Sequence, residues 1–147
     1  MNISSKGVAL IEQFEGFRPT MYKDAVGLPT IGYGTLIHTD TQQWLMTATI
    51  TKDQAEVLLR NSVTIIENIL NTVLPASVNQ NQFDALISFA YNLGISALKG
   101  STLLKKVIAN PNDPTIADEF AKWVHAGGEV LQGLVTRRKA ESDLYFS

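Results

Sequence analysis

The sequence has no cysteine among its 147 residues, which excludes a disulfide framework and a zinc–thiolate site. Residues 1–12 contain no apolar run long enough for a signal peptide or a membrane span. Only 18% of the residues are charged, so we do not expect a disordered chain. Packing must therefore hold the fold, and a 45% hydrophobic content is enough for one well-buried core.

Several kinds of functional site are also missing. The net charge is −2 and no basic stripe is present, so nucleic-acid binding by electrostatic attraction is not expected. The two histidines, His38 and His125, lie far apart and lack the spacing of metal ligands. No serine has a G-x-S-x-G context, and no phosphate-binding loop is present. The sequence thus predicts no metal and no cofactor.

The chain does contain two carboxylates and a hydroxyl within one short segment. Glu15 is predicted to end a helix, Asp24 follows nine residues later, and Thr30 follows after six more. Carboxylates on different elements can face each other across a bond, which is the arrangement that glycosidic hydrolysis requires. Glu15 is the candidate general acid, Asp24 its ionised partner, and Thr30 a hydroxyl that holds water. A partly desolvated site would keep the acid protonated near neutral pH.

Each of these residues also has an ordinary structural interpretation. Glu15 alone is readily a solvated glutamate, Asp24 suits a turn, and Thr30 suits a strand. Gly34 can let a sugar approach the backbone closely, or it can simply permit a tight hairpin. Only the combination of these residues at this spacing favours the catalytic interpretation.

The order of elements predicts an α+β fold with two lobes. A helix capped by Ser4 or Ser5 should end near Glu15, and residues 19–37 should form a small antiparallel sheet of two or three short strands. Residues 38–50 read as a loop. Capping-box signatures start helices at Thr51 and Asn79, the first of them a long helix that ends at residue 75. Further helices are expected over residues 101–108, 113–123 and 134–146, with a glycine-bracketed turn before the last one.

A basic run of three residues lies near the start of the last helix, formed by Arg137, Arg138 and Lys139. Such a run usually covers a solvated helix face. The functional alternative is an arginine that pairs with Glu15 and orients it, which would lower the pKa of the acid against the effect of burial.

Together these motifs resemble the bacteriophage lysozymes (endolysins) of glycoside hydrolase family 24. The Glu-x8-Asp-x5-Thr spacing, the Tyr22-Lys23-Asp24 triplet and the segment from Thr30 to Gly34 carry the resemblance at the N-terminal side. The segments starting at Thr51 and Asn79, the sequence Tyr91-Asn92-Leu93-Gly94 and the segment Gly133-Leu134 with Arg137, Arg138 and Glu141 extend it over nearly the whole chain.

The resemblance implies a single catalytic domain over residues 1–147 with a lysozyme-like two-lobe fold. Residues 16–50 would form the β-rich lobe, whereas residues 1–15 and 51–147 would form the helical lobe and the helix that connects the lobes. It also implies hydrolysis of the β-1,4 bond between N-acetylmuramic acid and N-acetylglucosamine in peptidoglycan. Glu15 would be the acid, with Asp24 and Thr30 positioning and activating water.

Further residues gain expected roles by the same resemblance. Leu36, Tyr91, Thr102 and Gly34 match or suit substrate-binding positions. Many members have histidine directly after the second hairpin glycine, where this chain has Thr35, so an arginine is expected to be the main partner of Glu15. Arg137 is the first choice for this partner and Arg138 the alternative.

The expected partners are peptidoglycan glycan strands, with no nucleic acid and no direct membrane anchor. The protein is expected to be a monomer that accumulates in the host bacterial cytoplasm and reaches the periplasmic wall through a holin. Two alternatives stay open, namely a lytic transglycosylase and a catalytically silent wall-binding module on a lysozyme scaffold.

Overall fold

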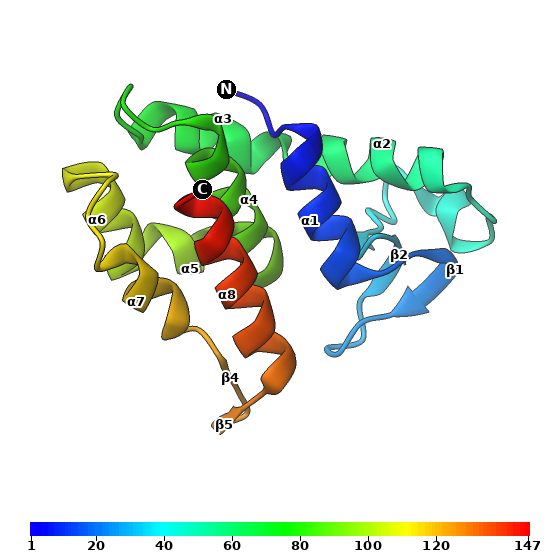
Figure 1. Cartoon of the computed structure of the whole chain (residues 1–147). Coiled ribbons are helices and arrows are strands. Elements are labelled where there is room, and N and C mark those ends of the chain that lie inside the picture. The colour runs from blue at the N-terminus through cyan, green and yellow to red at the C-terminus, as the bar shows by residue number, and fades with distance from the viewer. The chain divides into compact units, whose positions relative to one another are not determined.

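A computed structural model describes all 147 residues and contains eight α-helices, one 3-10 helix and two small antiparallel sheets (Figure 1). The chain forms two compact units. The sheet unit comprises Val8–Thr64, and the helical unit comprises Met1–Gly7 together with Ile65–Ser147. The predicted lobe boundaries and the single catalytic domain stay predictions.

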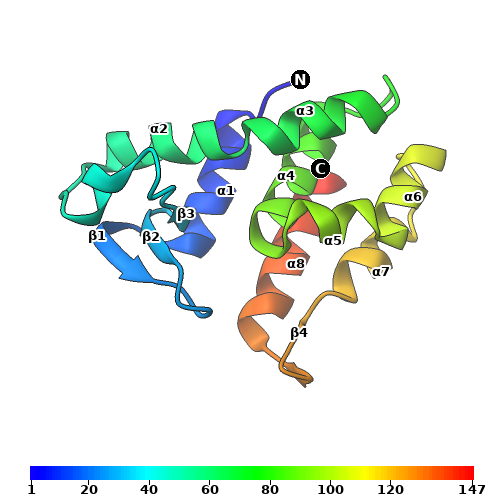
Figure 2. The same ribbon diagram turned by 180° about the vertical axis from the view of Figure 1, so that it is seen from behind.

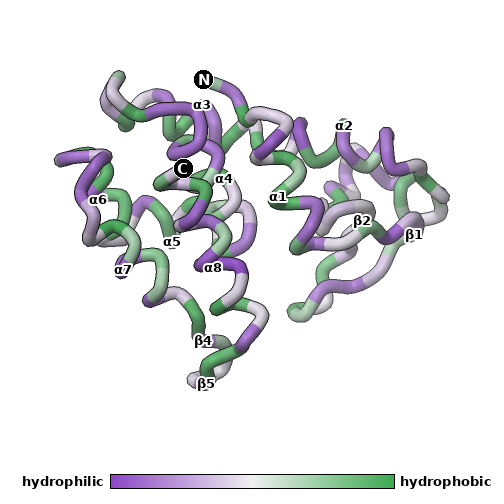
Figure 3. The backbone as a smooth tube through the Cα atoms, in the orientation of Figure 1, coloured by the Kyte–Doolittle hydropathy of each residue, from purple (hydrophilic) through white to green (hydrophobic).

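Helix α1 (Ser5–Glu15) ends at the candidate acid, as predicted. Ser4 caps it, because its Oγ accepts a hydrogen bond from the Gly7 N–H at 3.4 Å. Gly16 ends the helix with a φ of 71°, a left-handed conformation that glycine adopts without a steric cost, and its N–H donates to the Glu12 carbonyl. Figure 3 shows hydrophobic and hydrophilic positions alternating along this helix, and Ile11 is fully buried.

The sheet of this unit has three antiparallel strands in the order β1-β2-β3, which confirms the predicted small sheet. The strands are β1 (Arg18–Lys23), β2 (Pro29–Gly32) and β3 (Thr35–Leu36). Tyr22 lies opposite Thr30, and Thr30 lies opposite Leu36. An irregularity in the ladder between Arg18 and Tyr22 shifts the register of β1.

Residues 38–50, predicted as a loop, contain the 3-10 helix η1 (Gln43–Met46). Its Leu45 side chain is buried, so a core contact orders this connection. Helix α2 (Lys52–Ser62) begins as predicted, since Thr51 and Gln54 form a capping box.

The prediction of one continuous helix to residue 75 is wrong, because α2 stops at Ser62 and α3 (Thr64–Val73) starts two residues later. Two hydroxyls flank the break. Ser62 Oγ donates to the Leu59 carbonyl at 2.7 Å, and Thr64 Oγ1 donates to the Arg60 carbonyl at 3.3 Å. Side-chain bonds of this type compete with helical N–H donors and bend helices.

The helical unit is arranged around α4, which packs against α5 and α8. Every residue from Gln82 to Ala90 is buried, so α4 is a core helix on all sides. Its start is a capping box of Asn79 and Gln82, as predicted. The helices of this unit after α3 are α4 (Gln80–Leu93), α5 (Ile95–Lys99), α6 (Thr102–Ala109), α7 (Ile116–Ala121) and α8 (Gln132–Tyr145).

Three details of this unit differ from the predicted elements. The sequence pattern did not predict α5. The helix expected from residue 113 begins only at Ile116, because Asp113 Oδ1 instead accepts the Thr115 N–H at 2.9 Å and closes a turn. The glycine-rich turn before α8 is a small hairpin (Figure 2), formed by β4 (His125–Ala126) and β5 (Glu129–Val130).

The buried carboxylate of Glu119 makes stability depend on pH. Hydrogen bonds from Lys122 and Lys106, at 2.8 and 3.1 Å, lower its pKa below the ordinary 4.5. A lowered carboxyl pKa stabilises the folded state above pH 4.5, and this contribution disappears as pH falls through the folded pKa. We expect Glu119→Gln to lower the free energy of unfolding by about 1 kcal/mol at pH 7, and by much less at pH 3.

Urea unfolding at both pH values measures this difference. Glu129→Gln is the matched control, because Glu129 is exposed on β5 and has no ion-pair partner. A Glu119→Gln deficit of equal size at both pH values would contradict the prediction.

Candidate active site

The Glu15 carboxylate lies against the backbone of the hairpin that joins β2 and β3. A Cβ atom built on Gly34 would lie 2.5 Å from Glu15 Oε1 and 3.1 Å from its Cδ. Gly34 also has a φ of 71°, which disfavours any side chain. Gly34 therefore makes room for the candidate acid, whereas its predicted contact with a sugar stays a prediction.

A tight loop between β1 and β2 fixes one oxygen of Asp24. Its Oδ1 accepts the N–H of Val26 at 3.0 Å and the N–H of Leu28 at 2.9 Å. Gly27, with a φ of 87°, closes the loop by donating its N–H to the Asp24 carbonyl at 2.9 Å. The second oxygen, Oδ2, has no hydrogen-bond partner in the protein and can accept a proton or a water molecule. The turn interpretation and the catalytic one are thus compatible.

Thr30 is tied to the same loop through the backbone of Leu28. Its side chain is buried, with 4% exposed, and Oγ1 donates to the Leu28 carbonyl at 3.0 Å. The same carbonyl accepts the Asp24 N–H at 2.9 Å. Because its proton is committed to Leu28, the Thr30 oxygen can only accept from a further partner. Leu28, which the sequence did not indicate, thus connects Asp24 and Thr30.

Tyr22 is a second residue that the sequence analysis did not assign a role. Directly paired residues of neighbouring strands project to the same face of a sheet, so Tyr22, Thr30 and Leu36 form one row across β1, β2 and β3. Burial and the negative charges of Glu15 and Asp24 raise the pKa of Tyr22, while Arg18 acts in the opposite direction. Both candidate carboxylates therefore lie near this row. The cross-strand register was the missing information.

The structure contains no cluster of three or more histidine, aspartate or glutamate side chains that could hold a metal ion. None of its helices combines the length and the apolar character needed to cross a bilayer.

Sequence similarity identifies the family to which this chain belongs. Residues 12–141 match the family model described as phage lysozyme. The chain belongs to the phage lysozyme family. This range includes the Glu15, Asp24 and Thr30 segment, and it ends on α8.

Individual family members agree with this assignment. The chain is 43% identical to the endolysin of Bacillus phage B103 over its whole length, but it spans only 55% of that relative. It is 35% identical to the endolysin of Salmonella phage P22, of which it covers 99%. The solved endolysin of Escherichia coli O157:H7 phage FAHEc1 is 37% identical, with a TM-score of 0.87 over all of this chain and 94% of that one. The predicted lysozyme-like fold is confirmed.

The remaining predicted site residues of this family member lie on several elements. Leu36 on β3 is 40% exposed, and Thr35, at the position of the expected histidine, is buried opposite Ile31. Tyr91 is half-buried on α4, and Thr102 is exposed as the first residue of α6. These two belong to the helical unit, and their contacts with a glycan stay predictions.

Arg137 and Arg138 do not cover a solvated face, so that interpretation is wrong for both. They are 4% and 1% exposed, and both contact the fully buried Glu141, through Arg137 Nε at 3.4 Å and Arg138 Nε at 2.7 Å. Burial lowers the pKa of Arg138, and the charge of Glu141 opposes that shift. Asn92 accepts a further bond from Arg138 at 2.7 Å. Burying an uncompensated charge costs much free energy. The carboxylate of Glu141 supplies the opposite charge that allows both arginines to be buried.

Lys139, the third residue of the run, is solvated as predicted, and it pairs with Asp143 on the surface. A role of Arg137 or Arg138 in orienting Glu15 stays a prediction.

Proposed function

We propose that this protein hydrolyses the β-1,4 bond between N-acetylmuramic acid and N-acetylglucosamine in bacterial peptidoglycan, and thereby lyses the host cell. The observation that carries the proposal is the backbone of Leu28, which holds Asp24 and Thr30 together by hydrogen bonds in one loop. Glu15 belongs to the same sheet unit. Membership of the phage lysozyme family supports the same reaction.

In the proposed reaction, Glu15 donates its proton to the glycosidic oxygen as the bond to the anomeric carbon breaks. A water molecule between Asp24 Oδ2 and Thr30 Oγ1 donates one hydrogen to each oxygen, which turns its lone pair toward the anomeric carbon. As the water adds, Asp24 accepts its proton. Attack from the face opposite the leaving group inverts the anomeric configuration, whereas a nucleophilic Asp24 would retain it. Proton NMR of the fresh product distinguishes these outcomes.

The substrate and its route are part of the proposal. Leu36, Tyr91, Thr102 and Gly34 contact the glycan strand, and Arg137, or alternatively Arg138, orients Glu15. The protein acts as a monomer, accumulates in the host cytoplasm and reaches the wall after a holin has opened the membrane.

Product analysis tests the reaction. The protein is incubated with permeabilised Gram-negative cells, and turbidity and soluble fragments are followed. We expect clearing and fragments that end in reducing muramic acid. Anhydromuropeptides would instead show a lytic transglycosylase, and binding without clearing would show a wall-binding module.

Gly34 offers a test of the geometry around the acid. We expect Gly34→Ala to lower wall hydrolysis about 100-fold, because the new methyl group would displace the Glu15 carboxylate and misplaced catalytic groups lose about this much. Gly128→Ala is the control, since Gly128 also has a positive φ but no atom lies within 4 Å of the added Cβ. Rates and melting temperatures of both variants are measured, and a fully active Gly34→Ala protein would refute the expected displacement.

A further inference from the structure

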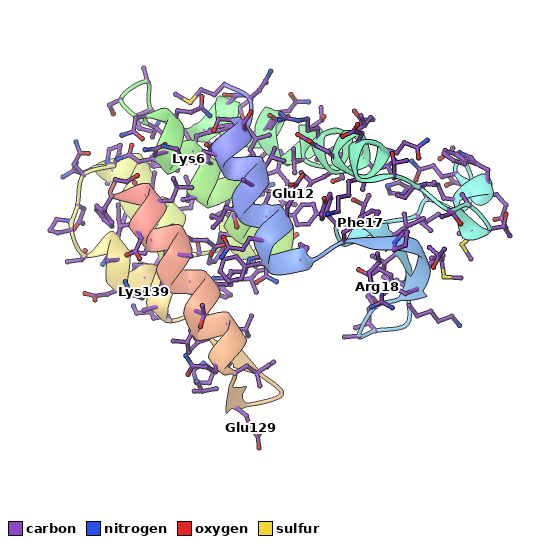
Figure 4. All side chains as sticks on the ribbon, turned by 45° about the vertical axis from the view of Figure 1, so that its right-hand side comes forward. Lys6, Glu12, Phe17, Arg18, Glu129 and Lys139 are labelled. Carbon is purple, nitrogen blue, oxygen red and sulfur yellow. The ribbon has the colours of Figure 1, made fainter.

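Arg18 presents an exposed guanidinium group that is held in place but makes no hydrogen bond. Its Cζ lies 4.3 Å from the centroid of the Tyr22 ring, a distance typical of a cation–π contact. The side chain has no ion pair with any acidic group of the protein. Its N–H donors therefore point in a fixed direction and have no acceptor within the protein, so they are available to bind an external anion. Arg18 lies at the start of β1 (Figure 4).

This guanidinium lies on the face of the sheet that carries the proposed active site. Tyr22 shares that face with Thr30 and Leu36 because the three are direct cross-strand partners. Arg18 stacks on the Tyr22 ring, so the contact places it beside the same row despite the ladder irregularity between the two residues. Lys23 follows Tyr22 directly and projects to the opposite face, because side chains alternate along a strand.

The charges around Tyr22 add a second argument. Glu15, Asp24 and Arg18 all act on the pKa of the Tyr22 hydroxyl, so the three charged groups are close enough to interact electrostatically with one side chain. An anionic part of a substrate would be repelled by the Asp24 carboxylate unless a cation compensated. Arg18 is the cation among the charged groups that act on Tyr22.

We propose that Arg18, supported by Tyr22, binds a free carboxylate of the peptide stem that peptidoglycan carries on its muramic acid residues. This inference rests on the proposed function and adds the part of the substrate that the sheet unit recognises. The glycan of such a strand is itself neutral, since its lactyl carboxyl group is amide-linked to the peptide. The free carboxylates belong to the stem, and a guanidinium group can bind one of them with two parallel hydrogen bonds.

The experiment compares two forms of one substrate, namely glycan strands with intact peptide stems and the same strands after a carbodiimide and ammonia have converted the free stem carboxylates to neutral amides. The values of kcat/KM are measured from released reducing ends for the wild type, Arg18→Gln, Arg18→Lys and Lys23→Gln. Lys23→Gln is the matched control because it removes one positive charge from the same strand on the other face. Melting temperatures establish that each variant is folded.

We expect Arg18→Gln to lower kcat/KM about 10-fold or more on strands with free stem carboxylates, mainly through KM, as expected for loss of a charge-assisted contact. It should leave the rate on amidated strands unchanged, with Arg18→Lys intermediate and Lys23→Gln like the wild type. Equal losses on both substrates, no loss on either, or the same loss in Lys23→Gln would overturn the assignment of Arg18. A wild type that cleaves neither substrate would instead overturn the proposed function and this inference with it.

Discussion

Glu15→Gln is expected to lower the rate of peptidoglycan hydrolysis by about 10²–10⁴-fold, the range associated with loss of a general acid. Glutamine keeps the size of the side chain and its place against Gly34, but it cannot supply the proton that the leaving oxygen needs. The fold should not change, because Glu15 is half-buried at the end of α1 and its replacement leaves no cavity. Turbidity loss of permeabilised cells measures the rate.

Glu12→Gln is the matched control for this change. Glu12 lies one turn earlier on α1, and burial together with the charge of Glu56 raises its pKa. The environment of Glu12 therefore favours its protonated form, as a general acid requires, yet Glu12 has no assigned catalytic role. We expect Glu12→Gln to retain most of the activity. Near-full activity of Glu15→Gln would show that Glu15 is not the general acid. Equal losses of activity in both variants would indicate a general defect of α1.

Glu141→Ala is expected to lower the free energy of unfolding by about 3–5 kcal/mol, because removing one partner of a buried ion pair leaves an uncompensated charge. Here two buried guanidinium groups, those of Arg137 and Arg138, would lose their shared carboxylate. The Ser88 hydroxyl, which donates to Glu141 at 2.6 Å, would lose its acceptor as well. Urea unfolding followed by circular dichroism measures the change.

Asp143→Ala on the same helix provides the comparison. Asp143 forms an exposed pair with Lys139 at 2.9 Å, in which both side chains are more than half exposed. Surface pairs of this kind contribute about 0–1 kcal/mol, so the Asp143→Ala protein should unfold nearly like the wild type. A Glu141→Ala protein of unchanged stability would show that the arginines find water or other acceptors without cost.

The fold was predictable where local signals decide the structure. The capping boxes at Thr51 and Asn79 start their helices at the expected residues because each depends on side chains only three positions apart. The break at Val63 was not predictable, since it depends on whether the neighbouring hydroxyls turn back to helical carbonyls. The extent of η1 depends on burial of Leu45, a tertiary contact that periodicity does not report.

The candidate site shows the same division. The types and spacing of Glu15, Asp24 and Thr30 identified the segment. The backbone contacts that hold these side chains could not be predicted from the sequence. Tyr22 lies in one cross-strand row with Thr30 only because of the register in which β1 pairs with β2. The burial of Arg137 and Arg138 could not be predicted from a basic run, because it requires Glu141 to lie between the guanidinium groups in the folded core.

Leu28 has a consequence for attempts to redesign this protein. It holds Asp24 and Thr30 only through its N–H and its carbonyl, while its own side chain is 47% exposed. Random mutagenesis at this codon should thus yield many functional variants, with proline excluded because it has no N–H to donate. A position that tolerates such variation can be used to attach a label or to adjust solubility at the edge of the catalytic loop.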